Sequence, residues 1–244
     1  MKKHVIEIAC NNYTSCYNAY TNGADRIELF ESIAEGGCTP SFGLMKKVKE
    51  SFNVPIYAMI RPRGGHFVYS QEEVDIMKSD INTCRVLAMN GIVFGALTSQ
   101  GHVDKRICEI LINTWKGQPV TFHRAIDRCI DIEQGIEDLI AMGFERVLTS
   151  GGEKNVEYGK EKIKMLQEKY GSKIKIMPGS GVTPQNVVSI LQYCQVQEIH
   201  ATCKKTVSQV EYNFNTKFSD EFVISDENEI STFIDAVANY EAQS

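Results

Sequence analysis

The sequence lacks long hydrophobic runs, a basic stripe and a Pro/Ser-rich linker, and each absence excludes a class of protein. The longest apolar run, from Val54 to Ile60, is far too short to cross a bilayer. Met1-Lys2-Lys3 leads into a predicted strand without an apolar signal region. With a net charge of -5 and no Arg-rich face, the chain is not expected to bind nucleic acid. We therefore expect a cytoplasmic protein with neither a nucleic-acid nor a membrane partner.

The chain also lacks any CxxC pair, although it contains 8 cysteines. Its 244 residues, 43% of them hydrophobic and 23% charged, are sufficient for a large core without a disulfide framework. We expect reduced and mostly buried thiols that behave as small hydrophobic side chains.

Several catalytic signatures are missing. No Lys stands at the end of a predicted strand, which argues against a Schiff-base aldolase. The chain has no Gly-x-Ser-x-Gly elbow, no HExxH motif and no P-loop. These absences exclude the hydrolases, zinc proteases and nucleotide-binding enzymes that depend on such motifs.

Strand-like segments alternate with helix-period apolar patterns along the chain. The predicted strands are Val5–Ala9, Arg26–Leu29, Ile56–Arg61, Ile92–Gly95, Val120–His123, Arg146–Thr149, Ile174–Met177 and Glu198–Ala201. This alternation predicts an α/β fold, a (β/α)8 TIM barrel formed by residues 1–244 as a single domain. A doubly wound sheet is the alternative, but Cys10-Asn11-Asn12 stands where its Gly-rich first turn belongs.

A long segment, residues 203–225, separates the last predicted strand from the final predicted helix. Segments of this length without a clear pattern are usually functional. We interpret it as an extended arm that docks on a second subunit or as a lid.

Period-two alternation sends polar side chains into the predicted barrel. Ile6 and Ile8 take the helix-facing side of their strand, which turns Glu7 inward, and the same argument turns Glu28, His123 and His200 inward. Because the eighth, first and second strands adjoin in a closed barrel, Glu7, Glu28 and His200 should lie side by side. The four residues could hold a hard or borderline divalent ion or act as acid and base. The alternative is an internal salt-bridge network with Arg61 and Arg63 as the partners.

Two glycine loops, Thr149–Gly152 and Pro178–Pro184, follow the sixth and seventh predicted strands. Such loops let backbone N–H groups approach an anion, although both can instead be tight turns. The candidate anion-binding residues are Arg61, Arg63, Arg124, Ser150, Gly151, Gly152, Gly179, Ser180 and Gly181.

Three cysteines are candidates for a soft-metal site. Cys10 ends the first predicted strand and Cys203 follows the eighth, so barrel closure brings them to one rim. Cys38 follows the second strand and could join them. Thiolates select Cu(I) or zinc, but the sequence spacing matches no metal motif, and unrelated thiols remain the alternative.

Six long motifs give the chain a resemblance to a known family. They are Gly23-Ala-Asp-Arg-Ile-Glu-Leu29, Glu35-Gly-Gly37 with Thr39-Pro-Ser41, Met59-Ile-Arg-Pro-Arg-Gly-Gly65, Val120-Thr-Phe-His-Arg-Ala125, Leu148-Thr-Ser-Gly-Gly152 and Met177-Pro-Gly-Ser-Gly-Val182. Together they resemble the CutC family, named for copper homeostasis, up to about residue 201. The resemblance implies a cytoplasmic barrel that handles Cu(I) through cysteines. Cys10 matches a family cysteine, whereas Phe30 stands where the family commonly has another, and Cys38 could replace it.

These observations leave three hypotheses open. The first is a copper-homeostasis protein that binds Cu(I) through cysteine. The second is a barrel enzyme for a small phosphorylated or carboxylated metabolite, in which Arg61, Arg63 and the glycine loops hold the anion while His123 moves protons with Glu7 or Glu28. The third is a catalytically idle barrel kept for partner binding. A homodimer is the expected assembly.

Overall fold

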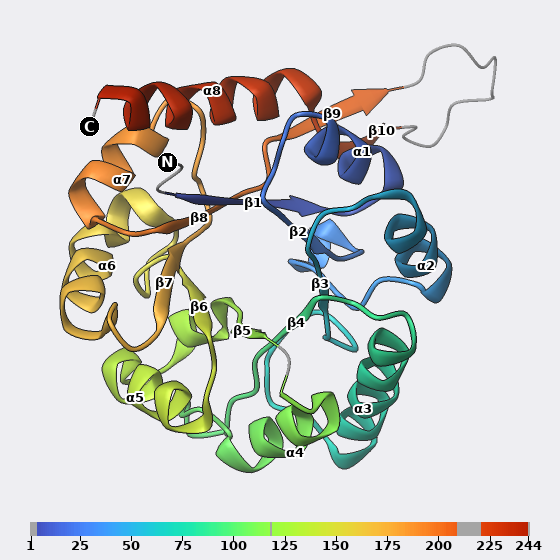
Figure 1. Cartoon of the computed structure of the whole chain (residues 1–244). Coiled ribbons are helices and arrows are strands. Elements are labelled where there is room, and N and C mark those ends of the chain that lie inside the picture. Colours follow the sequence, from blue (N-terminus) through green and yellow to red (C-terminus); the bar gives the residue numbers. More distant parts are fainter. Residues whose placement is uncertain (1–3, 118, 209–220, 244) are drawn as a thin grey trace.

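The computed structural model describes residues 4–117, 119–208 and 221–243, and its centre is a ring of parallel strands (Figure 1). The hydrogen-bonded order is β7-β6-β5-β4-β3-β2-β1-β8. The strands are β1 (Val5–Cys10), β2 (Arg26–Leu29), β3 (Ile56–Met59), β4 (Gly91–Phe94), β5 (Val120–Phe122), β6 (Arg146–Thr149), β7 (Lys175–Pro178) and β8 (Glu198–Ala201). Each strand of this order is paired in parallel with the next, which confirms the predicted TIM barrel and excludes the doubly wound sheet.

Helices surround the ring on its outer side (Figure 1). They are α1 (Tyr13–Thr21), α2 (Phe42–Ser51), α3 (Gln71–Val86), α4 (Lys105–Trp115), α5 (Ile132–Met142), α6 (Val156–Tyr170), α7 (Val187–Cys194) and α8 (Glu227–Gln243), with the short 3-10 helices η1 (Ile33–Glu35) and η2 (Arg124–Arg128). Side-chain caps fix several starts; Ser70 and Glu73 form a reciprocal capping box before α3. None of the described helices combines the length and apolarity needed to span a bilayer.

The two faces of each strand have different environments. Ile6, Ile8 and Ile27 are buried against the helices, as the alternation predicts, and Cys10 belongs to the same outer hydrophobic cluster. The inner face carries the polar residues. This division decides which side chains can reach the end of the barrel.

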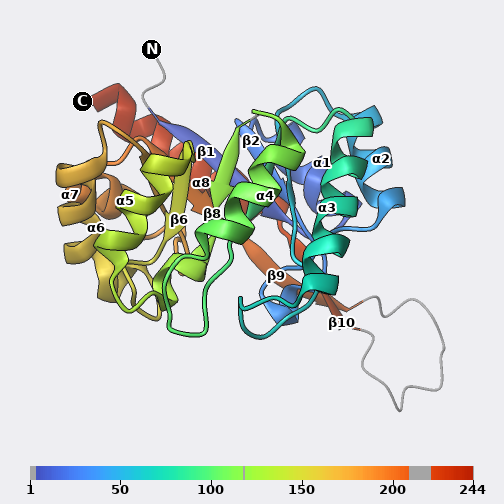
Figure 2. The same ribbon diagram turned by 90° about the horizontal axis from the view of Figure 1, so that it is seen from below.

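The segment that the sequence left without a pattern contains two strands. β9 (Lys204–Ser208) pairs antiparallel with β10 (Glu221–Ser225), and residues 209–220 lie outside the described residues. Figure 2 shows this hairpin leaving the barrel at its edge. Three hydrogen bonds of Ser225 hold its base. The Ser225 carbonyl accepts from the Asn18 side chain (2.9 Å), its hydroxyl donates to the Ala9 carbonyl (2.9 Å) and its N–H donates to the Ser15 hydroxyl (2.9 Å).

Candidate functional site

A cavity of about 880 Å³ opens at the carboxyl ends of the strands. Its lining includes residues at or just beyond the ends of most barrel strands: Ala9, Glu28, Met59, Arg61, His123, Leu148, Ser180, Gly181 and His200. Barrel enzymes place their active sites at this face, with the residues contributed by different strands.

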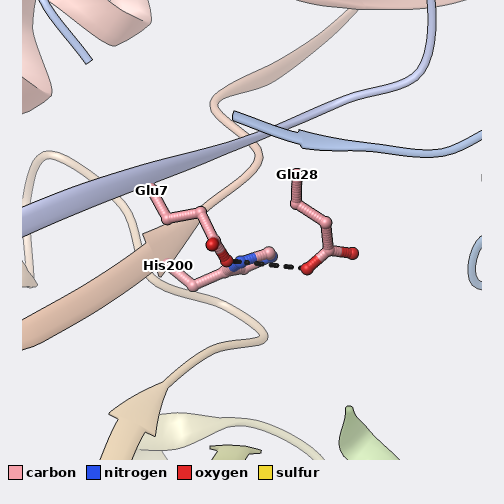
Figure 3. Close-up of side chains that lie close together, drawn as sticks. All are labelled: Glu7, Glu28 and His200. Atoms are coloured by element: carbon pink, nitrogen blue, oxygen red, sulfur yellow. Dashed lines mark hydrogen bonds and ion pairs between the residues drawn. The ribbon is translucent and has the colours of Figure 1, made fainter. Parts of the chain in front are cut away.

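Glu7, Glu28 and His200 lie side by side (Figure 3), as the sequence predicts, and Glu28 and His200 line this cavity. Their ligand-type atoms lie within 4.8 Å of one another. His200 Nδ1 lies 2.7 Å from Glu7 Oε1 and 3.7 Å from Glu28 Oε2. The strand register explains the grouping, because Glu7 pairs with His200 across β1 and β8, while Glu28 lies on β2 on the other side of β1.

The two carboxyl groups of this cluster differ in protonation. Burial opposes ionisation of Glu7, but Arg26 and His200 outweigh it and hold the Glu7 pKa well below its usual range. Burial raises the pKa of Glu28 to about 7, against the charge of His200 and with Glu7 adding to the rise. Within the described residues Glu28 Oε2 is buried without a hydrogen-bond partner. The cluster therefore combines a fixed carboxylate with a carboxyl group that can exchange a proton near neutral pH.

His200 connects these two carboxyl groups. Burial alone would lower the pKa of His200, but its hydrogen bond to Glu7 and the charges of Glu28 and Glu7 raise it. His200 also lines the cavity. It can therefore carry a proton between the cluster and a bound molecule.

The partners of the buried carboxylates are Arg26 and Arg146, which corrects the expectation that Arg61 and Arg63 would pair with them. Arg26 contacts both Glu7 and Glu198, the latter at 2.6 Å, and Arg146 contacts Glu198 at 2.9 Å. Both arginines stand at the beginning of their strands, whereas the expected partners, Arg61 and Arg63, lie beyond the end of β3. The signal was present, since Arg26 lies two residues before Glu28 and so shares its inward face.

Arg61 and Arg63 are held by other groups. Arg61 is buried and donates to the carbonyls of Glu35 (2.7 Å), Gly37 (2.8 Å) and Gly65 (3.0 Å). Arg63 forms an ion pair with Glu73 of α3 at 2.5 Å. Of these two arginines, Arg61 lines the cavity, whereas Arg63 is directed to α3.

The glycine loop after β6 already contains an anion, the side chain of Asp127. Asp127 accepts hydrogen bonds from the amides of Ser150 (3.0 Å) and Gly152 (3.0 Å) and from the Thr149 hydroxyl (2.5 Å). The Gly151 amide donates to Thr149 Oγ1 at 2.9 Å. The amides of the candidates Ser150, Gly151 and Gly152 are thus occupied by the protein itself.

Arg124 completes this arrangement from the other side of Asp127. Its Nε donates to Asp127 at 2.9 Å and its guanidinium also contacts the Ser150 hydroxyl at 2.8 Å. Arg124 lines the cavity and its side chain is 39% exposed, so it still offers positive charge to a ligand.

The loop after β7 faces the cavity directly. Gly179 donates its amide to the Thr149 carbonyl at 3.0 Å, while Ser180 and Gly181 line the cavity with positive φ angles of 76° and 79°. Of the two glycine loops, the loop after β7 is therefore the one that a bound anion can reach.

The candidate metal-binding cysteines are not gathered into one compact group. Cys10 is fully buried, and burial, with the neighbouring thiols Cys16 and Cys203 contributing, raises its pKa. Burial raises the pKa of Cys203 to about 12, although Cys203 lines the cavity. Cys38 is partly exposed and forms a β-bridge with Glu31. Within the described part of the chain the one compact trio of metal-type ligands is Glu7, Glu28 and His200.

Phe30 occupies the position where the resembled family commonly has cysteine. It packs in the inner cluster with Ala9, Tyr57, Met59 and Val93 and lines the cavity. Phe30 therefore lies on the inner face of the sheet, and Cys10 lies on the outer face.

Comparison with known proteins gives relatives along most of the chain. Residues 4–205 match the model of the CutC family. The copper homeostasis protein cutC homolog of Homo sapiens is 43% identical over 202 residues, covering 83% of this chain and 74% of that protein. The family protein CutC of Histophilus somni is 42% identical over 199 residues, which is 82% of either chain.

Solved structures agree with these sequence relatives. The structure of CutC from Streptococcus agalactiae aligns with a TM-score of 0.78 and 34% identity over 82% of this chain and 98% of that one. Phosphoribosyl anthranilate isomerase from Thermotoga maritima aligns with a TM-score of 0.61 over 97% of this chain and 99% of that one, at 13% identity, which shows a shared fold alone. With the family model matched across the barrel and relatives above 40% identity, this chain belongs to the CutC family of copper homeostasis proteins.

Proposed function

We propose that this barrel is an enzyme that performs acid–base chemistry on a small phosphorylated or carboxylated metabolite bound in the cavity. One observation carries the proposal: Glu28 and His200 line the cavity at the site where Glu7 holds His200 by a 2.7 Å hydrogen bond. A carboxyl group with a pKa of about 7 is well matched to proton transfer near neutral pH.

Each residue of the cluster has a distinct role in this proposal. Glu28 exchanges a proton with the substrate, because its carboxyl group is the one poised near neutrality. His200 accepts or supplies the second proton. Glu7 does not touch the substrate; it is a positioning residue that fixes the orientation of the His200 ring, and Arg26 keeps Glu7 ionised.

The cavity offers cationic and backbone groups for an anionic substrate. Arg124 and Lys204 line it together with Ser180 and Gly181 of the loop after β7. An anion held at that loop would place the rest of a small molecule over His200, which the Gly179 backbone approaches closely.

A thermal-shift screen of phosphorylated and carboxylated metabolites tests the proposal, followed by turnover assays on each compound that stabilises the protein. Glu28→Gln should lower turnover by a factor of about 10²–10⁴ while leaving binding nearly unchanged. Glu168→Gln, an exposed position on α6, is the control and should behave as wild type. Turnover that survives in Glu28→Gln would exclude Glu28 as the proton-transfer group.

Cu(I) binding is the second candidate, and two observations favour it. Human and mouse relatives are named copper homeostasis proteins, and the Cys16 and Cys203 thiols lie near enough to Cys10 to influence its pKa. Sulfur is the ligand type that Cu(I) selects, but Cu(I) must displace protons from Cys10 and Cys203, and burial has raised the pKa of both thiols. Cu(I) would therefore bind with proton release.

An anaerobic Cu(I) titration against a chromogenic chelator tests this candidate. Wild type should compete for the ion and Cys10→Ser should not. Cys108→Ser is the matched control, because Cys108 is as fully buried as Cys10 but lies on α4. Equal competition by Cys10→Ser and wild type would remove the thiolate site.

The cytoplasmic location and the homodimer stay predictions under either candidate. Light scattering coupled to gel filtration measures the assembly, and fractionation of the host cell measures the location. A monomer would exclude the idea that residues 203–225 form an arm on a second subunit.

A further inference from the structure

The two histidines that line the cavity, His123 and His200, have different hydrogen-bond partners. This difference gives His123 a role that no residue of the acid–base cluster has. His200 is hydrogen-bonded to a carboxylate, whereas the Nδ1 atom of His123 accepts the backbone N–H of Ala125 at 3.2 Å. A ring nitrogen that accepts an amide proton carries no proton itself. The proton of the neutral His123 ring must therefore lie on Nε2.

The surroundings of His123 keep this ring neutral and fixed. Burial, together with the positive charge of Arg61, lowers the pKa of His123 to about 3. The ring lies 4.8 Å from the Phe67 ring, centroid to centroid. Gly95 makes room for it, since a Cβ on that residue would come within 2.6 Å of His123 Nδ1. His123 is thus a rigid hydrogen-bond donor, a different role from the proton-moving one that the sequence suggested.

Three buried polar atoms of cavity-lining residues have no hydrogen-bond partner within the described part of the chain. They are Nε2 of His123, Nε of Arg61 and Oε2 of Glu28. Two are donors and one belongs to the carboxyl group with the raised pKa. Buried polar atoms are normally paired, so atoms without a partner on residues that line one cavity indicate what its ligand supplies. A ligand that matches them has an oxygen acceptor near His123 and Arg61 and an exchangeable proton near Glu28.

We propose that the substrate of this cavity carries a carbonyl group whose oxygen accepts the Nε2–H of His123, and that the reaction removes a proton from the carbon next to that carbonyl. This inference rests on the acid–base function proposed above and specifies its substrate class. The substrates are small oxo compounds with a phosphate or carboxylate group.

The proposed step balances without any further reactant. The ionised Glu28 carboxylate takes the proton as the C–H bond breaks. The electron pair of that bond forms a C=C bond, and the π electrons of the carbonyl move to its oxygen. His123 Nε2–H and the Arg61 guanidinium stabilise the resulting enolate oxygen, as preorganised donors do at developing oxyanions. When the carbon that loses the proton also carries a hydroxyl group, Glu28 returns the proton to the former carbonyl carbon, and His200 takes the hydroxyl proton and delivers it to the enolate oxygen. The hydroxyl oxygen becomes the new carbonyl oxygen, which completes an isomerisation.

The tautomer can be measured without knowing the substrate. In protein labelled with ¹⁵N-histidine, the five histidines are few enough to resolve, and His123→Phe assigns the signal. The His123 signal should show a bare Nδ1 and a protonated Nε2 throughout pH 5 to 8, while His200 serves as the internal comparison. A His123 ring that titrates in this range, or that carries its proton on Nδ1, would overturn the proposal.

Binding of a known enediolate mimic tests the substrate class. The probe is phosphoglycolohydroxamate, and the comparison ligand is glycerol 1-phosphate, which has the phosphate but no planar oxyanion. Wild type should bind the hydroxamate about tenfold more tightly or better, the effect of one hydrogen bond to a charged oxygen. His123→Phe should lose that preference and His123→Gln, which keeps a donor at the Nε2 position, should recover part of it.

The outcomes separate this inference from the function on which it rests. Equal affinity of wild type for both ligands, binding of neither, or unchanged preference in His123→Phe would overturn the carbonyl assignment. The metabolite screen with Glu28→Gln would still stand as the test of acid–base catalysis, because it does not involve His123.

Discussion

The barrel interior has two polar layers of different character, and the difference separates stability from function. In the lower layer, at the beginning of the strands, Arg26 and Arg146 share Glu198, and Arg26 also pairs with Glu7. Tyr57 lies under both guanidinium groups, at 5.1 and 5.2 Å from its ring centroid. The upper layer, at the ends of the strands, contains atoms of Glu28, Arg61 and His123 that have no hydrogen-bond partner among the described residues.

The two layers differ in how they offset the cost of burying polar and charged groups. Taking charges from water into a barrel is expensive, and the lower layer offsets it by pairing each carboxylate with an arginine. The upper layer leaves donors and an acceptor incomplete, which a protein tolerates where a ligand completes them. Glu7 joins the layers, because it pairs with Arg26 below and holds His200 above.

The largest expected effect comes from breaking the lower layer. Arg26→Met leaves Glu7 and Glu198 buried without one of their partners, so it should lower the free energy of unfolding by about 3–5 kcal/mol. Urea denaturation measures the change. Lys78→Met, which removes an exposed ion pair with Asp75, is the control and should have no measurable effect. A loss in Arg26→Met as small as that of the control would show that the layer is not stabilising.

In contrast to Arg26→Met, Glu28→Gln should raise the free energy of unfolding at high pH. The folded-state pKa of Glu28 lies above the unfolded value, so its contribution is favourable below about pH 4.5 and is lost as pH rises through about 7. Removing the charge should therefore stabilise the protein by about 3 kcal/mol at pH 8 and change little at pH 4.5.

Denaturation of Glu28→Gln at both pH values measures this difference. Glu7→Gln is the comparison, because its expected effect at pH 8 has the opposite sign. The Glu7 pKa is depressed, so its stabilisation is present above about pH 4.5 and is lost as pH falls further. Glu7→Gln should destabilise the protein at pH 8. If both substitutions destabilise it there, the two carboxyl groups do not differ as described.

A smaller effect is expected at the loop after β6. Asp127→Ala removes the acceptor of the Ser150 and Gly152 amides and should cost about 1.5–3 kcal/mol. The vacated amides should then accept an anion, so sulfate should raise the Tm of the variant more than that of wild type. Sodium chloride at equal ionic strength is the control. An equal response to sulfate in both proteins would contradict the internal-anion interpretation of this loop.

The smallest effect concerns thiol reactivity. Cys38 and Cys129 are partly exposed, whereas the other six cysteines are buried. In native protein a disulfide reagent should modify Cys38 and Cys129 first and Cys10 only on unfolding. Peptide mass spectrometry of the modified protein identifies the sites. Early modification of Cys10 would show that its pocket opens, which would favour the Cu(I) candidate.

Most of the fold follows from the sequence because alternation of strands and helices is a local property. The same period of two correctly placed Glu7, Glu28 and His200 on the inner face, and strand order made them neighbours. Phe30 and Cys10 show the effect of an offset of one residue. Cys10 pairs with Leu29 and lies on the outer face, whereas Phe30, one residue after Leu29, lies on the inner face.

The pairing of charges could not be deduced in the same way. Arg61 and Arg63 follow the end of β3, which is the end of the barrel where the site was expected. In the structure loop carbonyls bind Arg61 and Glu73 binds Arg63. Asp127 fills the glycine loop after β6 only because η2 brings it there from the end of β5. Such partners depend on loop conformation and on residues far apart in the chain.

The sequence by itself determined the barrel, its inward-facing carboxylates and the family, because each depends on local periodicity or on long motifs. The tertiary structure decided which of these groups are satisfied. Closure of the ring supplies Arg26 and Arg146 to the lower layer, and the loops leave Glu28, Arg61 and His123 incomplete at the cavity. Hydrogen-bond satisfaction is a property of positions in space, and it appears only when the strands have closed.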